Sequence, residues 1–314
     1  MSVRGNKPAA AVPLPMRDGV APSYLWLPEG QWPDMLSFLV ERYPQISAAQ
    51  WLDRMARGDV VDGDGAALAP GSAYRRGMRI FYYRELERET PIPFQEAILY
   101  QDEQLVVVDK PHFLPMTPGG RFVQETLLTR LKKSLDCAEL TPIHRLDRET
   151  AGVVIFSRQP SSRGAYQSLF QRREVRKTYE ALAPRLDGRD FPFTYRSRMV
   201  DGDKFFLMRE EAGEPNSETI IDIIEQRGEL NLYRLQPHTG RKHQLRVHLA
   251  SLGIPIVNDA FYPLALPCKE DDMSQPLQLL ARAIAFTDPL TGQERQYASR
   301  RVLALEGEEC HGAG

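Results

Sequence analysis

A cluster of charged residues lies near the middle of the chain, immediately before an apolar segment that is expected to form a strand. The segment PIHRLDRETAGVVIFS, residues 142–157, places a His, two Arg, an Asp and a Glu within six residues. Charges beside a buried strand are costly unless they are paired or used in chemistry. Gly152 stands at the junction, where a sharp turn or a close backbone approach is expected. The pattern predicts a polar loop over the end of a core strand at 153–157, with Asp147 as the candidate catalytic carboxylate.

Asp147 also has a simpler interpretation. An Asp that lies between Arg145 and Arg148 commonly forms a surface ion pair, and the sequence DRET could cap a turn or a helix. Spacing alone does not decide between this interpretation and catalysis, so the rest of the chain has to be considered.

Composition excludes several classes of protein. The chain has 314 residues, which allows two domains, and its 42% of hydrophobic residues is ordinary for a globular protein with a core. No apolar run approaches the ~20 residues of a membrane span, and no apolar segment follows the basic N-terminal residues as in a signal peptide. Three scattered Cys without a CxxC pair argue against a zinc site or a disulfide framework. We therefore expect a cytoplasmic protein that uses neither a metal nor a membrane.

The net charge of −2 at pH 7 does not by itself indicate nucleic-acid binding. Basic residues are nevertheless clustered, while acidic residues gather in other segments. Each cluster could belong to one basic face, or it could be a solvated surface. The clusters lie at 130–133, 172–177 and 241–246.

A small domain is expected over 24–90, after a flexible tail at 1–23 that is rich in Ala, Pro and Gly. Helices are expected at 35–43 and from residue 47 to 57. The second has the clearest signals, which are the capping box of Ser47 with Gln50, the hydrophobic staple of Ile46 with Trp51 and a stop at Gly58. A DGDG turn at 62–65 follows, and the charged, Pro-bearing segment 83–93 is expected to be a linker.

Short strands and few helices are expected over 91–305, with a C-terminal tail at 306–314. The strands do not alternate with helices as regular βαβ units do, which predicts the α+β class. Helices are expected near 123–131, at 163–173 and at 239–251, the last capped by Thr239 and with Lys242 and Arg246 together on one face. Strands are expected at 98–100, 105–108, 153–157, 178–182, 196–200, 205–209, 219–224, 230–235 and 277–286.

Four ordered motifs resemble the RluA family of RNA pseudouridine synthases. They are LVVVDKPHFLP at 105–115, HRLDRETAG at 144–152, KTYEAL at 177–182 and TGRKHQLRVHLASLGIPIVND at 239–259. The resemblance implies the pseudouridine synthase fold, a mixed, mainly antiparallel sheet with flanking helices and a central RNA cleft. The first domain resembles the αL-motif RNA-binding domain that often precedes such synthases. Ala48 stands where that domain usually has an Arg, so a small packing domain is the alternative.

The resemblance implies an enzyme that isomerises specific uridines in ribosomal or transfer RNA to pseudouridine. The reaction breaks the bond between the ribose and ring nitrogen 1 of uracil and rejoins the base through carbon 5, without gain or loss of atoms. No cofactor is therefore chemically required. Positive charge develops on the sugar, and a carboxylate can stabilise that charge, attack the anomeric carbon or accept a proton. The resemblance gives this role to Asp147 and leaves the choice among the three open.

Two further catalytic residues follow from the resemblance. Arg246 matches an Arg that pairs with the catalytic Asp, with a phosphate contact or a plain surface position as the alternative. Tyr179 matches a Tyr whose ring stacks on the target base and whose hydroxyl assists proton transfer. A flat aromatic face suits an unstacked base, although a half-buried Tyr in a strand needs no such explanation.

The target uridine has to be flipped out of folded RNA. Arg145 matches an Arg that fills the space the base leaves, with an ion pair to Glu149 or Asp147 as the alternative. His144 could contact a phosphate or satisfy a core hydrogen bond, and we favour the latter. The other residues expected to contact RNA are Arg148, Lys177, Arg241 and Lys242.

Two other functions compete with the isomerase. One is a non-catalytic RNA-binding protein or assembly factor that keeps the fold, and the other is a hydrolase that uses Asp147 with His144. The joint presence of Asp147, Tyr179 and Arg246 favours the isomerase, acting on RNA as a monomer. His243 and His248 are five residues apart rather than at the i, i+4 spacing of a helical zinc pair, so no metal site is expected.

Overall fold

The computed structural model describes residues 12–86, 88–266 and 272–303, which divide into two compact units. Of the described residues, unit 1 comprises those up to Glu89 together with Gly119–Gln124, and unit 2 comprises Thr90–Pro118 and those from Glu125 onward. The sequence placed 119–124 in the second domain, so its grouping with unit 1 is a correction. The tail predicted at 306–314 and the first eleven residues of the N-terminal tail lie outside the described residues.

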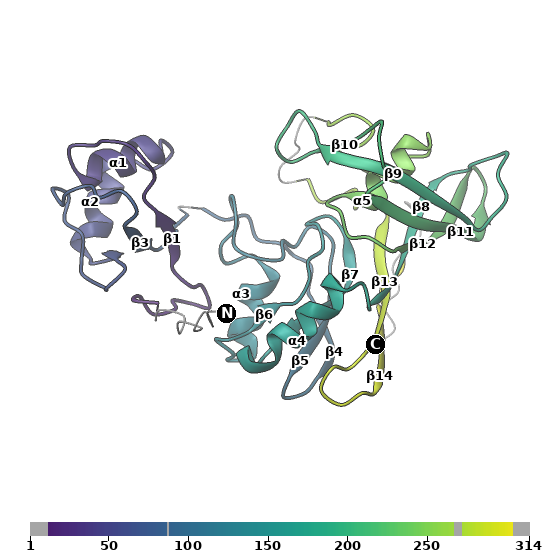
Figure 1. The fold of residues 1–314 in the computed structure, drawn as a ribbon, viewed down its shortest axis with the longest axis horizontal. Helices are drawn as coiled ribbons and strands as arrows, with labels where there is room; N and C mark the ends of the chain where they lie inside the picture. The colour runs from purple at the N-terminus through teal and green to yellow at the C-terminus, as the bar shows by residue number, and fades with distance from the viewer. Residues whose placement is uncertain (1–11, 87, 267–271, 304–314) are drawn as a thin grey trace, which may run out of the picture. The chain divides into compact units, whose positions relative to one another are not determined.

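Unit 1 is a small α/β body with its own core. Two helices, α1 (Met35–Arg42) and α2 (Ala48–Ala56), pack with an antiparallel sheet of order β1-β3-β2 (Figure 1). The strands are β1 (Ser23–Trp26), β2 (Val60–Asp62) and β3 (Arg79–Tyr82). The capping box of Ser47 and Gln50 is confirmed, and Ile46 packs against the core cluster that contains Trp51. Both helices therefore begin where the sequence predicted.

The N-terminal tail was predicted to extend to residue 23, and its described part departs from that prediction. Val20 is buried, and β1 begins at Ser23. Arg17 forms an ion pair of 2.5 Å with Asp59 and lies over the Tyr83 ring at 3.9 Å. Such attachment through single side chains produces no periodicity, so pattern analysis could not detect it.

Unit 2 is built on one mixed sheet of 11 strands, which confirms the predicted α+β class. Its main path runs β10-β9-β11-β12-β8-β13-β7-β5-β4, with β14 paired to β13 and β6 paired to β7. Each neighbouring pair is antiparallel except β13 with β7, which is parallel. The strands are β4 (Ala97–Gln101), β5 (Leu105–Lys110), β6 (Thr141–Pro142), β7 (Ala151–Ser157), β8 (Arg176–Pro184), β9 (Phe193–Asp201), β10 (Met208–Glu211), β11 (Ser217–Arg227), β12 (Leu230–Pro237), β13 (Leu279–Thr287) and β14 (Glu294–Ala298).

Three helices flank this sheet, namely α3 (Leu127–Ser134), α4 (Pro160–Gln171) and α5 (Gln244–Ser251) (Figure 1). From α4, Tyr166 and Leu169 pack on the strands β5 and β7. Helix α5 is buried over its first six residues and packs with β9, β10 and β11. Unlike the predicted amphipathic helix, α5 has no solvent face along this stretch.

Three predictions about unit 2 were wrong in detail. The helix expected from Thr239 begins only at Gln244, because a turn at 242–243 with a left-handed backbone at His243 precedes it. The strand expected at 205–209 starts at Met208, since residues 203–206 form a turn. No strand was predicted after residue 286, yet β14 pairs with β13 there. An exposed edge strand of alternating polar residues carries little hydrophobic signal.

Gly152 has the role that its position at the head of a core strand suggested. Its φ is +113°, and a Cβ atom there would lie 2.3 Å from the carbonyl oxygen of Ala281 on β13. The parallel pairing aligns Ala281 with Gly152. Only a glycine lets the two backbones approach so closely, so Gly152 sets where the preceding polar loop leaves the sheet.

Candidate active site

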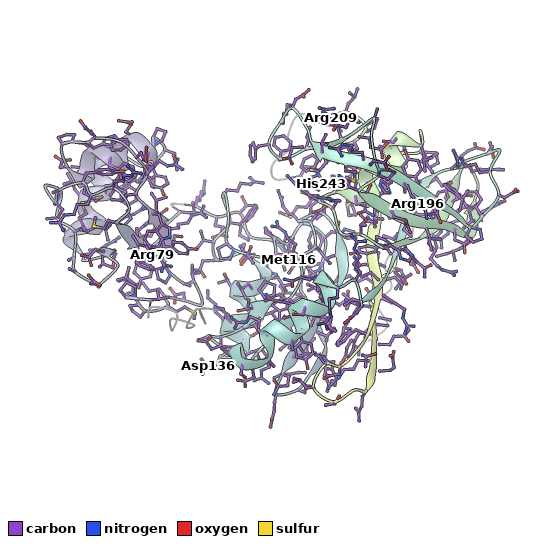
Figure 2. The ribbon with its side chains drawn as sticks, viewed as in Figure 1. Arg79, Met116, Asp136, Arg196, Arg209 and His243 are labelled. Atoms are coloured by element: carbon purple, nitrogen blue, oxygen red, sulfur yellow. The ribbon has the colours of Figure 1, made fainter. Side chains whose placement is uncertain are left out.

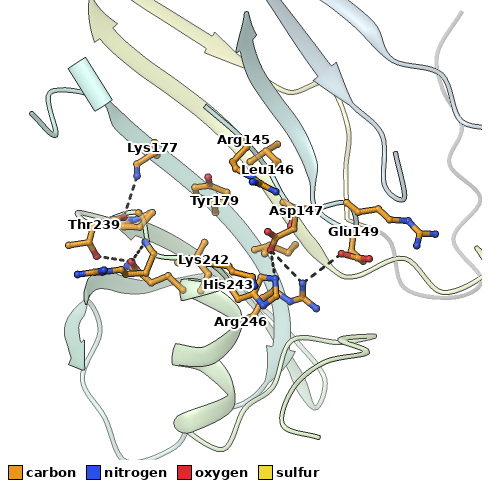
Figure 3. A pocket seen from close by; sticks show the side chains of 18 residues that line it. Arg145, Leu146, Asp147, Glu149, Lys177, Tyr179, Thr239, Lys242, His243 and Arg246 are labelled. Carbon is orange, nitrogen blue, oxygen red and sulfur yellow. Dashed lines mark hydrogen bonds and ion pairs between the residues drawn. The ribbon is translucent and has the colours of Figure 1, made fainter. Parts of the chain in front are cut away.

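Eight of the nine residues predicted for the site line one cavity of about 570 Å³ in unit 2 (Figure 3). The loop between β6 and β7 supplies one wall, β8 supplies a second, and the turn before α5 with α5 itself supplies the third. The lining residues that were predicted are Arg145, Asp147, Arg148, Lys177, Tyr179, Arg241, Lys242 and Arg246. Strand β13 lies between β7 and β8 and so holds the first two walls side by side.

Arg246 is the most constrained charge in the cavity. Its side chain is 1% exposed, and it donates from Nε at 2.8 Å and from Nη2 at 2.6 Å to the two oxygens of Asp259. This bidentate pair leaves Nη1, which lies 3.5 Å from Asp147 Oδ2 and 3.8 Å from Glu149 Oε2. Asp259 in turn accepts from the amides of Phe261 and Tyr262. The guanidinium is therefore fixed by the fold and presents its third nitrogen to Asp147.

Burial alone would lower the pKa of Arg246, but the hydrogen bond and charge of Asp259, with Asp147 and Glu149, raise it above its ordinary value. The guanidinium hence stays charged at any pH at which the protein is folded. A permanent cation therefore lies 3.5 Å from Asp147 Oδ2 and attracts that carboxylate. The surface position considered for Arg246 is wrong, and the face it was expected to share with exposed Lys242 does not exist.

The loop that carries Asp147 is held in place by the last residue of β5 and by the segment that follows this strand. Buried Lys110 donates from Nζ to three carbonyls, including that of Arg148 at 3.0 Å. His112 Nδ1 donates to the carbonyl of Glu149 at 2.6 Å. Arg148 donates from Nε to the carbonyl of Phe113 at 3.1 Å. The two peptide carbonyls that follow Asp147 are thus both held, which fixes the direction of its side chain.

Sequence analysis did not assign Lys110 to the site. Burial lowers its pKa to about 7, while the charges of Glu149 and Asp147 act in the opposite direction. Its three carbonyl acceptors match the three N–H bonds of an ammonium group. The available signal was a Lys at the end of a fully buried strand that begins with four apolar residues.

His243 is a second residue that the sequence did not assign to the site. Its Nε2 lies 3.8 Å from Asp147 Oδ2, and its Nδ1 lies 2.8 Å from the hydroxyl of Tyr262. That hydroxyl accepts from the amide of Met208, so its own proton is available for Nδ1. Nδ1 is then the acceptor, and Nε2 carries the hydrogen that points toward Asp147. His243 lies three residues before Arg246, and this spacing was the available indication that the two side chains face the same partner.

The imidazole of His243 is neutral. Burial lowers its pKa to about 4, although the charge of Asp147 opposes the shift and that of Arg246 reinforces it. Asp147 Oδ2 is therefore approached by one cationic and one neutral N–H group. His243 lies in the turn before α5 and Arg246 lies on α5, so one continuous segment directs two N–H groups toward one oxygen.

Tyr179 lies on β8 and faces the cavity (Figure 3). It is half-buried, and burial together with the charge of Asp147 raises the pKa of its hydroxyl above the ordinary value. Among the described residues its hydroxyl has no hydrogen-bond partner, which leaves both the ring face and the hydroxyl available to a ligand. A phenol that keeps its proton can donate a hydrogen bond but cannot act as a base near neutral pH.

Four basic residues at the cavity differ in how firmly they are held. Lys177 donates to the carbonyl of Thr239 at 3.3 Å, and burial followed by the charge of Arg173 lowers its pKa. Lys242 donates to the carbonyl of Phe205 at 3.1 Å, and Arg241 to that of Asn216 at 3.4 Å. Arg145 is exposed and, within the described part of the chain, forms neither the ion pair with Glu149 nor that with Asp147. Its guanidinium is free to move.

His144 is the predicted site residue that does not line the cavity. Its Nε2 accepts from the amide of Ile155 at 3.1 Å, and its ring stacks on Phe170 at a centroid distance of 4.7 Å. Burial, then the charge of Lys177, lowers its pKa to about 3, so it is neutral. The geometry supports the core hydrogen bond that we favoured, and the phosphate contact is withdrawn.

Across the described ranges no three His, Cys, Asp or Glu side chains converge as a metal site. No helix within the same ranges is long and apolar enough to cross a membrane.

Comparison with known proteins places this geometry in a family. The family described as RNA pseudouridylate synthase matches residues 104–251, which contain every catalytic candidate. An uncharacterised RNA pseudouridine synthase of Synechocystis is 30% identical over 73% of this chain and 79% of its own length. This chain belongs to the RluA family of RNA pseudouridine synthases. It is accordingly an isomerase whose substrate is RNA.

Two further relatives agree with this assignment. The dual-specificity RNA pseudouridine synthase RluA of Salmonella typhi is 33% identical over 64% of this chain and 91% of its own length. The solved structure of human RNA pseudouridylate synthase domain containing 1 aligns with a TM-score of 0.54 at 22% identity, and covers 68% of this chain and 86% of that one. At that identity the structural likeness shows the fold, and the predicted pseudouridine synthase fold is confirmed.

Proposed function

We propose that this RluA-family synthase converts specific uridines of ribosomal or transfer RNA to pseudouridine, with Asp147 as its catalytic carboxylate. The observation that carries the proposal is the geometry at Asp147 Oδ2, which faces the buried Arg246 at 3.5 Å within the cavity that Tyr179 also lines. The names of relatives, a dual-specificity RluA and a yeast mitochondrial tRNA pseudouridine(32) synthase, favour these two classes of RNA. A cytoplasmic location, a monomeric state and RNA binding by unit 1 stay predictions.

Asp147 has the properties that cleavage of a C–N glycosidic bond requires. Positive charge develops on the ribose as the bond breaks, and an anion beside the anomeric carbon stabilises it. With a side chain that is 26% exposed, Asp147 is accessible to a ribose that enters the cavity. The same carboxylate could attack the anomeric carbon or accept the ring proton, and the three roles require the same ionised oxygen.

Arg246 would then act on the catalytic carboxylate, and Tyr179 would act on the uracil base. Arg246 attracts the Asp147 carboxylate and holds it in place, while the Asp259 fork prevents the guanidinium from turning toward the substrate phosphate. Tyr179 offers a ring face on which the flipped uracil stacks, and its protonated hydroxyl donates to a uracil oxygen. The base stays bound between breakage and rejoining because both contacts tolerate its rotation.

The basic residues at the cavity would hold the RNA backbone. Lys177 on β8 and Arg241 and Lys242 on the turn before α5 lie on the other two walls of the cavity and suit phosphate contacts. Arg145 is exposed and has no ion pair in the described structure, so it can stack into the gap that the flipped nucleotide leaves.

The test is release of tritium from carbon 5 of labelled uridine in bulk ribosomal RNA and, separately, in bulk transfer RNA. We expect activity from the purified protein and none from Asp147→Asn or Asp147→Ala, with urea midpoints close to wild type. Asp187→Asn is the matched control, because Asp187 is 84% exposed and lies outside the cavity. Full activity of Asp147→Ala would refute the catalytic assignment. RNA binding without isomerisation of either RNA class would instead favour a non-catalytic RNA-binding protein.

A further inference from the structure

The turn between β9 and β10 holds a phenyl ring in water. Phe205 is 91% exposed, the highest value among the large hydrophobic residues that the structure describes as exposed. Single exposed apolar residues are common, and exposure by itself needs no explanation. Phe205 differs because its backbone is fixed and because several basic residues lie nearby.

The backbone of this turn is held at both ends. The amide of Gly202 donates to the carbonyl of Leu207 at 3.0 Å, and the amide of Leu207 donates to that of Lys204 at 2.8 Å. Lys242, which lines the catalytic cavity, donates from Nζ to the carbonyl of Phe205 at 3.1 Å. The backbone of Phe205 is thus hydrogen-bonded directly to a residue that lines the active-site cavity.

A row of aromatic contacts joins the turn to the catalytic guanidinium. The rings of Phe205 and Phe206 meet edge to face at 5.3 Å, and Phe206 packs on Phe261 at 5.5 Å. The guanidinium of Arg246 lies over the Phe261 ring at 4.7 Å. Phe206 and Phe261 are partly buried and anchor the row, which leaves Phe205 as its solvent-facing end.

Several basic residues lie near Phe205, on a turn that also carries the acidic Asp203. Lys204 and Arg209 flank it on the turn and on β10, and Lys242 and Arg241 lie on the adjoining turn before α5; all four side chains are exposed. Figure 2 shows Arg209 on β10 and His243 before α5 in the same part of unit 2, where β10 packs with α5. Exposed aromatic rings among cations are the combination by which proteins bind unpaired nucleotides.

We propose that Phe205 is a stacking platform for an unpaired base of the substrate RNA, next to the flipped uridine. This inference rests on the proposed function in that the RNA lies in the Asp147 cavity. The ligand is a nucleobase of a single-stranded loop, because a base within a duplex offers no free face to a ring. Lys204 and Lys242 would hold the phosphates on either side of that base.

The experiment measures RNA binding separately from catalysis. Dissociation constants for bulk ribosomal RNA and bulk transfer RNA are determined with Asp147→Asn protein, with and without Phe205→Ala, Phe205→Leu and Phe205→Trp. Stacking on one base corresponds to about a 5- to 150-fold change in affinity. We expect that loss with Ala and Leu for the RNA class that is the substrate, and affinity close to the parent with Trp.

A second measurement uses the active protein. Phe205→Ala should raise the RNA concentration for half-maximal tritium release by a similar factor and leave the rate at saturation unchanged. Leu290→Ala is the control, since Leu290 is 50% exposed on the β13–β14 turn, at the other end of unit 2 from β10. Equal affinity of the Ala variant and its parent would overturn the proposal, as would Leu binding as well as Phe. Activity of Asp147→Asn would contradict only the proposed catalytic role.

Discussion

Arg246 pairs with Asp259 in the fold and also faces Asp147 in the cavity. Variants of this pair should therefore change stability and activity independently of one another. Arg246→Met removes the guanidinium and leaves Asp259, whose side chain is 1% exposed, as a buried charge without its partner. Breaking a buried ion pair in this way costs about 3–5 kcal/mol. The double variant Arg246→Met/Asp259→Asn removes both charges, and the Asn oxygen can still accept from the amides of Phe261 and Tyr262.

We therefore expect the double variant to regain most of the stability that the single variant loses. A coupling free energy of about 2–3 kcal/mol between the two positions would correspond to contact within one network. Activity should not return, because Asp147 has lost its cation in both proteins. At 3.5 Å the pair attracts by at most about 4–5 kcal/mol for an effective dielectric constant near 20. We expect kcat/KM to fall about 100- to 1000-fold, which corresponds to about 3–4 kcal/mol.

Urea unfolding of the wild type, both single variants and the double variant gives the stability terms, and tritium release from bulk RNA gives the activity. Asp259→Asn is the internal control, because it keeps the cation beside Asp147 while it weakens the fork. Recovery of activity together with stability in the double variant would refute the reasoning, since Arg246 would then serve only the fold.

The structure supports four further predictions. Lys110→Met should lower the free energy of unfolding by about 1–3 kcal/mol, because three backbone carbonyls lose their donor. It should also reduce kcat, because the Asp147 loop loses the bond that holds the Arg148 carbonyl. Urea unfolding and tritium release would measure the two effects, and an unchanged kcat would contradict the role of Lys110 in holding the loop. Gly152→Ala should prevent folding or lower the urea midpoint strongly, since its Cβ would lie 2.3 Å from a backbone oxygen, whereas Gly164→Ala, with open space, should not. His243→Asn, which tolerates the left-handed backbone, should lower kcat about tenfold and leave KM for RNA unchanged, as removal of one N–H donor requires; a change confined to KM would argue against it. The free energy of unfolding should fall as the pH is lowered from about 6.5 to 4, because the unfolded chain binds more protons than the folded chain in that range. The fall should reach up to about 1.4 kcal/mol per pH unit for each imidazole whose pKa is lowered. A flat pH profile of the urea midpoint would contradict the lowered pKa values, which are those of His112, His144, His243 and His248.

The sequence predicted most of the cavity because the lining residues that it identified lie in three local motifs. The position of Asp147 and the need for glycine at 152 followed from a polar loop that meets an apolar strand. The second helix of unit 1 was predicted from its cap and staple, which are local signals. Such features depend on neighbours within a few residues, where spacing is informative.

What the sequence did not show depends on contacts between distant residues. The Asp259 fork explains why Arg246 is buried, but no spacing rule links an Arg on a helix to an Asp in the following loop. Lys110 and His112 were missed because they are joined to the Asp147 loop through backbone carbonyls, which lie 38 and 37 residues away and have no sequence signature. The start of α5 was placed too early because the left-handed turn at His243 is made by a residue that is not glycine.

The position of β13 in the middle of the sheet has a consequence for how the enzyme folds during translation. Residues 279–287 are synthesised after all but one of the other strands, yet they fill the middle of the sheet, between the half that carries Tyr179 and the half that begins after Asp147. Until this segment leaves the ribosome, the two halves have no shared ladder. A nascent chain halted before residue 279 should therefore be unable to modify RNA, and the interval before β13 arrives is when the open edges of β7 and β8 are most exposed to mispairing.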